Sequence, residues 1–268
     1  MNARQIDMQV LSVSPQIFAY QIEAATAVQV CRLLNDEFAL TVQARPDRFQ
    51  AIAHLPMQSP QDAVTELERC VRDLGFRGAI ICTHVNGMNL DDPSLAAFYA
   101  KVQELDVPVF LHPQQVLAAE RLARYHLGNL IGNPTETAVA AASLIFGGVL
   151  KDFPRLKFYL AHAGGTCPYI RGRWEHGWRV RPEARQHIER PPSEYFRLLY
   201  FDSLAHSVPA LAFLIDNVGA ERVMMGTDYD ADMSDTDPVK TIASVPGLSD
   251  RERALIYGDN AEALFSIG

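Results

Sequence analysis

Three polar residues that could bind a metal ion each stand at the end of a short apolar run. His112 belongs to Phe-Leu-His-Pro, His162 to Tyr-Leu-Ala-His-Ala-Gly-Gly, and Asp228 to Met-Gly-Thr-Asp-Tyr. Imidazole nitrogens and carboxylate oxygens are ligands that suit a divalent ion such as Zn²⁺. An ion with an open coordination position can polarise a carboxylate or lower the pKa of water. The three segments therefore predict a metal-dependent enzyme.

Each of these residues also has an ordinary structural interpretation when it is taken alone. His112 could be a hydrogen-bonding group at the end of a strand, and Asp228 could cap the N-terminus of a helix. His162 precedes Ala-Gly-Gly, which lets the backbone turn tightly and leaves the imidazole facing outward. The metal interpretation gains weight only because all three residues would converge on the same end of one sheet.

The elements that would position these residues alternate regularly between strands and helices. Strand-like runs are predicted at 8–14, 49–54, 78–82, 107–112, 157–162, 198–203 and 222–226. Between them, helical spacing of apolar residues predicts helices that include 23–43, one opening at Pro60, and 135–150. Strict alternation implies a parallel sheet with helices on its faces, which leaves a barrel or an open doubly wound sheet.

The distribution of polar residues favours the barrel. No Gly-x-Gly-x-x-Gly sequence follows any strand, so the nucleotide-binding open sheet has no support. Polar residues instead gather where strands end, at Ser12, Ser14, His54, His84, Asn86, His112, His162, Asp202, His206 and Asp228. A barrel builds its active site at that rim. We predict one α/β domain over 1–268, a (β/α)8 TIM barrel of which only seven strands are found.

Composition limits the partners. The chain has 268 residues, 48% of them hydrophobic, and a formal net charge of −8. An acidic chain lacks the basic face that nucleic acid requires, and no run has the length and apolarity of a membrane helix. Cys31, Cys70, Cys82 and Cys167 lack the paired spacing of a zinc knuckle or a disulfide scaffold. We predict a cytoplasmic enzyme of small molecules, without nucleic-acid or membrane partners.

The order of His-Pro, His-x-Gly-Gly and Gly-Thr-Asp-Tyr resembles the amidohydrolase-related family, specifically its aminocarboxymuconate-semialdehyde decarboxylase branch. Similar segments run along the whole chain, at 10–15, 55–58, 75–78, 83–86, 134–137 and 200–203. The resemblance implies that His112 and Asp228 bind the metal, most simply Zn²⁺, and that His162 activates water or moves the proton during decarboxylation.

The resemblance also implies substrate-binding residues and a homodimer. Arg173 matches an arginine that reaches a substrate carboxylate across a dimer interface, a task suited to the fixed fork of a guanidinium. His84 and Asn86 are predicted to bind substrate from the same rim. Trp174 and Trp178 flank Arg173 at helical spacing. They could lie in the interface or pack on the chain's own core.

This sequence departs from the family pattern at its start. Family members begin with a strand that ends in His-x-His and supplies two further metal ligands, whereas this chain begins at what corresponds to the second strand. A family arginine that precedes the second strand would be absent as well. One histidine and one aspartate are fewer than the three or four protein ligands of a tight zinc site. We expect either a gene start placed too late or a truncated product, and we favour the first.

Two further departures concern the substrate. Gln114 stands where the branch has tryptophan, and Asp230-Ala231-Asp232 stands where it has Pro-Phe-Pro. Both changes replace apolar surface with polar groups, so we expect a substrate other than aminocarboxymuconate semialdehyde. The predicted activity is decarboxylation of an unsaturated or aromatic carboxylic acid. A metal-dependent hydrolase of a lactone or amide, and a non-catalytic truncated barrel, are the alternatives.

Overall fold

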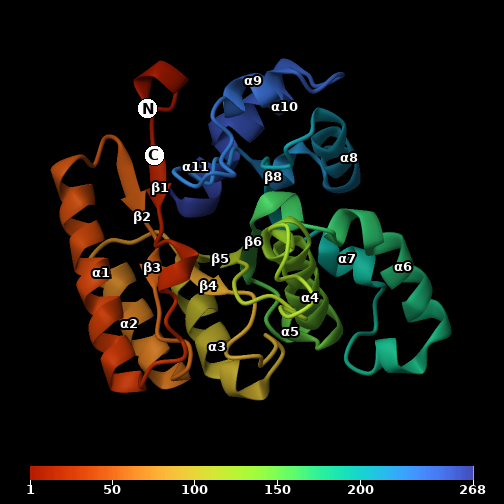
Figure 1. Ribbon diagram of the computed structural model, residues 1–268, viewed down its shortest axis with the longest axis horizontal. Helices are drawn as coiled ribbons and strands as arrows, with labels where there is room; N and C mark the ends of the chain where they lie inside the picture. The colour runs from red at the N-terminus through yellow and green to blue at the C-terminus, as the bar shows by residue number, and fades with distance from the viewer. Residues whose placement is uncertain (268) are drawn as a thin grey trace.

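Parallel strands form an open barrel in the computed structural model, which describes residues 1–267 (Figure 1). One sheet pairs β1 (Gln9–Leu11) with β2 (Phe49–Ala51). The other runs in chain order through β3 (Ala53–His54), β4 (Ala79–Cys82), β5 (Pro108–His112), β6 (Lys157–Leu160), β7 (Tyr200–Asp202) and β8 (Val223–Met224). All seven predicted strand regions form strands, which confirms the α/β barrel architecture.

The region predicted as one strand at 49–54 is divided between the two sheets. The Ile52 N–H donates to the Leu11 carbonyl, whereas the Ala53 N–H donates to the carbonyl of Gly78. The chain therefore changes partner at this point, and the barrel wall continues from β1 round to β8. Within residues 1–267, β1 and β8 do not pair with each other, so the barrel has an open side.

Helices cover the outside of this wall (Figure 1). They are α1 (Ala24–Ala44), α2 (Pro60–Arg72), α3 (Ala96–Leu105), α4 (Asn133–Phe146), α5 (Val149–Asp152), α6 (Cys167–Val180), α7 (Pro192–Phe196), α8 (Val208–Val218), α9 (Pro238–Ala243), α10 (Asp250–Ala254) and α11 (Asn260–Phe265). The first two agree with the predicted helices. The helix predicted at 135–150 is divided after α4, because Gly148 takes a left-handed conformation (φ 83°) that ends regular helix. None of the described helices is both long and apolar enough to cross a membrane.

A buried polar network fixes the end of β3 against α1 and α2. The Asn35 side chain bonds both the N–H and the carbonyl of His54, at 2.9 and 3.0 Å. Its amide also donates to Glu66, and Arg69 donates two hydrogen bonds to the same carboxylate. Glu66 is 1% exposed, so these contacts satisfy a carboxylate whose burial would otherwise be costly.

The imidazole of His54 predicts a loss of stability in acid. The side chain is fully buried, neither ring nitrogen has a partner among the described residues, and burial lowers its pKa from 6.5 to about 4. Between these values the unfolded chain binds a proton that the folded chain does not, so stability falls as pH falls. Protonation linked to His54 should therefore lower the free energy of unfolding by about 2 kcal/mol between about pH 7 and about pH 4.5.

Urea unfolding of the wild type and of His54→Leu at both pH values measures this contribution. The variant should lose about 2 kcal/mol less than the wild type over the same interval, because leucine does not titrate. Equal losses in the two proteins would show that His54 is not the responsible group.

Candidate metal centre

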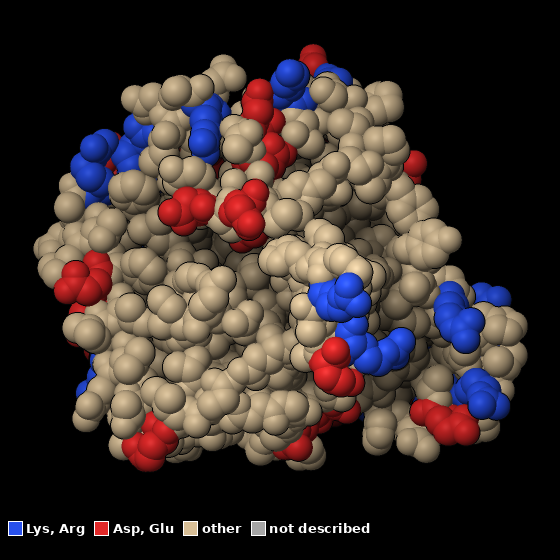
Figure 2. All heavy atoms as spheres, viewed as in Figure 1, with Lys and Arg blue, Asp and Glu red and all other residues tan. Residues whose placement is uncertain are grey.

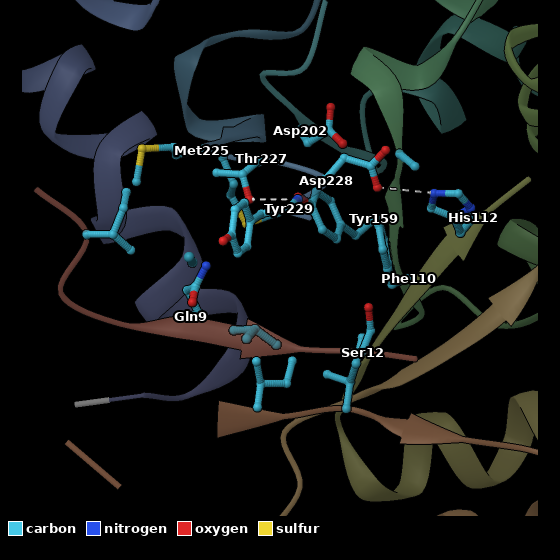
Figure 3. A pocket seen from close by; sticks show the side chains of 18 of the residues that line it. Gln9, Ser12, Phe110, His112, Tyr159, Asp202, Met225, Thr227, Asp228 and Tyr229 are labelled. Atoms are coloured by element: carbon cyan, nitrogen blue, oxygen red, sulfur yellow. Dashed lines mark hydrogen bonds and ion pairs between the residues drawn. The ribbon is translucent and has the colours of Figure 1, made fainter. Parts of the chain in front are cut away.

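The ends of β5, β6 and β8 bring the three sequence-predicted residues together. Figure 3 shows two of them, His112 and Asp228, facing each other. One nitrogen or oxygen atom from each of His112, His162 and Asp228 lies within 4.8 Å of the others. Asp228 lies between the two rings, with Oδ1 3.7 Å from His112 Nε2 and Oδ2 3.6 Å from His162 Nε2. The predicted convergence of the three segments is therefore present in the structure.

The donor atoms fit a cation. The Nδ1–H of His112 donates to the Pro113 carbonyl at 3.0 Å, which orients the ring so that Nε2 faces Asp228. That Nε2 is buried and has no hydrogen-bond partner among the described residues. Its separation from Asp228 is too long for a hydrogen bond but close to the roughly 3 to 3.5 Å that separates two ligands of one ion.

The electrostatic environment favours a negatively charged Asp228 beside the imidazole rings of His112 and His162. Contacts with His112 and then with His162 hold the pKa of Asp228 well below its usual range. Burial opposes a charge on His162, but Asp228 and Asp202 outweigh that effect and raise the pKa of His162. Asp228 is thus ionised at neutral pH, and His162 is suited to exchange a proton there.

Two glycines explain why the motifs have their spacing. A Cβ on Gly226 would lie 2.6 Å from the Cβ of Asp202, so only glycine lets the chain pass to Asp228 this close to β7. A Cβ on Gly165 would lie 2.3 Å from the Pro134 carbonyl oxygen. The glycines after His162 therefore allow the turn to dock on the start of α4.

The metal-ligating group, by which we mean the candidate ligands His112, His162 and Asp228, lines a cavity of about 1460 Å³ that extends along the open side of the barrel. Its polar lining residues near the rim include Gln114, Asn129 and Asn133, and Asp230 and Asp232 stand exposed on the β8 loop. In Figure 2 the face seen in Figure 1 is hollowed near its centre, with basic and acidic side chains scattered around broad neutral stretches. The cavity is large enough for a small conjugated acid.

An aromatic wall in this cavity was missed by sequence reasoning. Phe110 and Tyr159 both line it, with stacked rings whose centroids are 4.7 Å apart (Figure 3). The signal was available, because Phe110 precedes His112 by two residues and alternate residues of a strand share a face. The register then places Tyr159 of β6 directly beside Phe110.

His84 and Asn86 lie outside the metal-ligating group, on the loop after β4. His84 Nε2 lies 2.8 Å from the Gln115 carbonyl oxygen, and its Nδ1 accepts from the N–H of Gly87. Asn86 donates to the Tyr20 carbonyl at 2.7 Å. Both side chains tie this loop to neighbouring backbone, and their role in substrate binding stays a prediction.

Arg173 is exposed on α6, and no described carboxylate lies within ion-pair distance of it. Trp174 points the other way and packs edge-on against Phe146 and Phe196. Trp178 is also partly buried against the core. The two tryptophans thus pack on the chain's own core, while the guanidinium faces outward.

Comparison with known proteins agrees with this geometry. A family model described as amidohydrolase matches residues 1–267. The 2-amino-3-carboxymuconate-6-semialdehyde decarboxylase of Dictyostelium discoideum is 38% identical over 263 residues, which cover 97% of this chain and 73% of that protein.

Solved structures show the same fold. A Rhizobium 2,6-dihydroxybenzoate decarboxylase complexed with 2,6-dihydroxybenzoate superposes with a TM-score of 0.92 at 30% identity, covering 100% of this chain and 86% of that one. A dihydroxybenzoic acid decarboxylase from Polaromonas sp. JS666 was solved with bound manganese and the inhibitor 2-nitroresorcinol. It superposes with a TM-score of 0.91 at 29% identity, covering 100% of this chain and 84% of that one.

Proposed function

Because the chain belongs to the amidohydrolase family, we propose that it is a metal-dependent, nonoxidative decarboxylase of an aromatic or unsaturated carboxylic acid. The observation that carries this proposal is the grouping of His112, His162 and Asp228 within 4.8 Å at the rim of a large cavity. We also propose that residues 1–268 form one barrel domain. The similarity to decarboxylases of conjugated acids supports the reaction type.

In this proposal His112 and Asp228 hold a divalent ion. When bound, the ion supplies a positive charge that fixes a substrate oxygen and draws electron density from the conjugated acid. We favour Zn²⁺, because imidazole nitrogen and carboxylate oxygen both suit this ion. Mn²⁺ is the second candidate, because a similar structure contains it. Elemental analysis after reconstitution with each metal separately decides between them.

His162 moves the proton. Its Nε2 faces the cavity beside Asp228, which favours the protonated ring. The ring places its proton on the carbon that carries the carboxylate, and the bond from that carbon to the carboxylate then breaks. The electron pair of that bond restores the conjugation as CO₂ leaves.

The cavity walls suit a planar acid of low charge. Phe110 and Tyr159 offer aromatic faces on which a conjugated ring can stack. The exposed carboxylates of Asp230 and Asp232 repel a polyanion, so a monocarboxylate is favoured over a dicarboxylate. Gln114 lines the cavity next to the metal-ligating group and offers hydrogen bonds where the related branch has an indole. A hydroxylated aromatic monocarboxylate is therefore the substrate class to test first.

The test incubates the metal-loaded protein with 2,6-dihydroxybenzoate and measures CO₂ release. Equal amounts of CO₂ and decarboxylated product support the proposal. Hydrolysis of a panel of lactones and anilides without CO₂ from any aromatic acid would instead establish the hydrolase alternative. Neither activity, together with no retained metal, would establish a non-catalytic barrel.

We further propose a homodimer in which Arg173 binds the substrate carboxylate in the partner's cavity. Arg173→Ala should then raise KM about 30-fold, because a charge-assisted, forked contact is lost. Mixing this variant with His162→Gln provides the control. A mixed dimer contains one site with an intact His162 and an intact Arg173, so activity should return at low substrate. Its failure to return, or a monomer in solution, contradicts the shared site.

The proposed compartment is the cytoplasm. All four cysteines are free and buried, as is ordinary for a protein in a reducing environment. Fractionation of the native cell with an antibody against the protein tests this assignment.

A further inference from the structure

His162 stands in a backbone turn that ordinary residues avoid. His162 and Ala163 have φ values of 55° and 54°, and Gly164 and Gly165 follow at 74° and 59°. Glycine adopts this left-handed region freely, but side chains with a Cβ do so at a steric cost. Something outside the turn must therefore hold the first two residues in place.

Asp202, at the end of β7, makes the contacts that do so. Its Oδ2 accepts a hydrogen bond from the N–H of His162 at 2.8 Å. Its Oδ1 accepts from the N–H of Ala163 at 2.7 Å and from that of Leu204 at 2.9 Å. The side chain is nearly fully buried. Three backbone N–H groups thus donate to the two oxygens of Asp202. An ionised carboxylate can accept all three hydrogen bonds because it carries no hydrogen of its own.

The neighbouring backbone fixes Asp202 in turn. Gly226 passes so close that a Cβ there would overlap the Asp202 Cβ, and the Gly226 N–H lies 3.3 Å from Ser203 Oγ. Asp202 therefore has little room to shift toward Gly226. Two carboxylates thus contact different parts of His162: Asp228 contacts the ring, and Asp202 contacts the backbone.

We infer that Asp202 is a positioning residue, which holds the 162–163 turn so that the His162 ring faces the cavity and Asp228. The inference rests on the proposed role of His162 in proton transfer. Asp202 also lines the cavity, but its two carboxylate oxygens already accept hydrogen bonds from three backbone N–H groups. It lies outside the group of possible metal-ligating atoms among the described residues.

Asp202→Asn in the metal-loaded protein tests the inference. One amide oxygen keeps the bonds from Ala163 and Leu204, but the amide NH₂ then faces the N–H of His162. Amide exchange at His162 and Ala163 should speed up about 10-fold or more, because the holding contact is gone. With 2,6-dihydroxybenzoate, kcat should fall about 30-fold while KM changes less than about 3-fold, and metal content should not change.

Two further variants separate positioning from general damage. Glu66→Gln changes another buried carboxylate to an amide, in the distant network of α2, and should leave kcat and the exchange at 162–163 unaltered. Ala163→Gly lets the turn form without help, since glycine accepts φ near 54°. Added to Asp202→Asn, it should restore about 5-fold of the lost kcat.

The outcomes are distinct. An Asp202→Asn protein with normal kcat and exchange, an equal kcat loss in Glu66→Gln, or no recovery with Ala163→Gly overturns the inference. If Asp202→Asn folds only in the Ala163→Gly background, the turn depends on Asp202 and the inference is supported. If it folds in neither background, Asp202 is a general stability residue and the inference fails. A wild type that releases no CO₂ defeats the proposed function instead, and amide exchange still reports on Asp202.

Discussion

Asp228→Asn should lower the affinity of the protein for its divalent ion about 100-fold or more, and decarboxylation should be lost with the ion. The carboxylate is the only acidic member of the metal-ligating group, and its contacts with His112 and His162 keep its pKa low. An asparagine keeps the shape and one oxygen but removes the negative charge. The one proposed ligand that remains, His112, cannot hold the ion tightly by itself.

Metal content after dialysis and calorimetric titration with Mn²⁺ or Zn²⁺ measure this effect. Asp230→Asn is the matched control, because it removes a carboxylate two residues away that is exposed and outside the metal-ligating group. Its metal affinity should stay within about 3-fold of the wild type, since an exposed charge is screened by solvent. Equal affinities in Asp228→Asn and the wild type would place the ion elsewhere.

The sequence predicted those features of the fold that depend on local pattern. Runs of apolar residues located all seven strand regions, and Pro60 marked the start of α2 because its ring suits the first turn of a helix. The convergence of His112, His162 and Asp228 followed from topology, since parallel strands in a barrel end at one rim. Such predictions need no knowledge of side-chain contacts.

What the sequence did not predict depends on contacts between distant segments. The change of partner at Ile52 is set by Leu11 and Gly78, which lie far from it along the chain. The hydrogen bond from His84 to the backbone of Gln115 crosses from one strand end to the next. Asp202 was recognised as a polar residue at the rim, but its bonds to His162 and Ala163 join residues 40 and 39 positions apart.

His162→Gln should lower kcat about 1,000-fold while the metal content stays that of the wild type. Glutamine has no group that takes up or releases a proton near neutral pH, so it cannot replace the imidazole in proton transfer. His112 and Asp228, which hold the ion in the proposed site, are left in place. Any fall in metal content comparable to that of Asp228→Asn would make His162 a ligand rather than the proton donor.

Added metal should distinguish Asp228→Asn from His162→Gln. Asp228→Asn should lose metal and turnover together, and excess metal should restore part of its activity by mass action. His162→Gln should remain inactive at any metal concentration, because its defect lies in the chemical step. Single-turnover measurements with saturating 2,6-dihydroxybenzoate isolate that step from substrate binding. Recovery of His162→Gln by added metal would assign His162 to metal binding and leave the proton donor to be found among the other residues of the cavity.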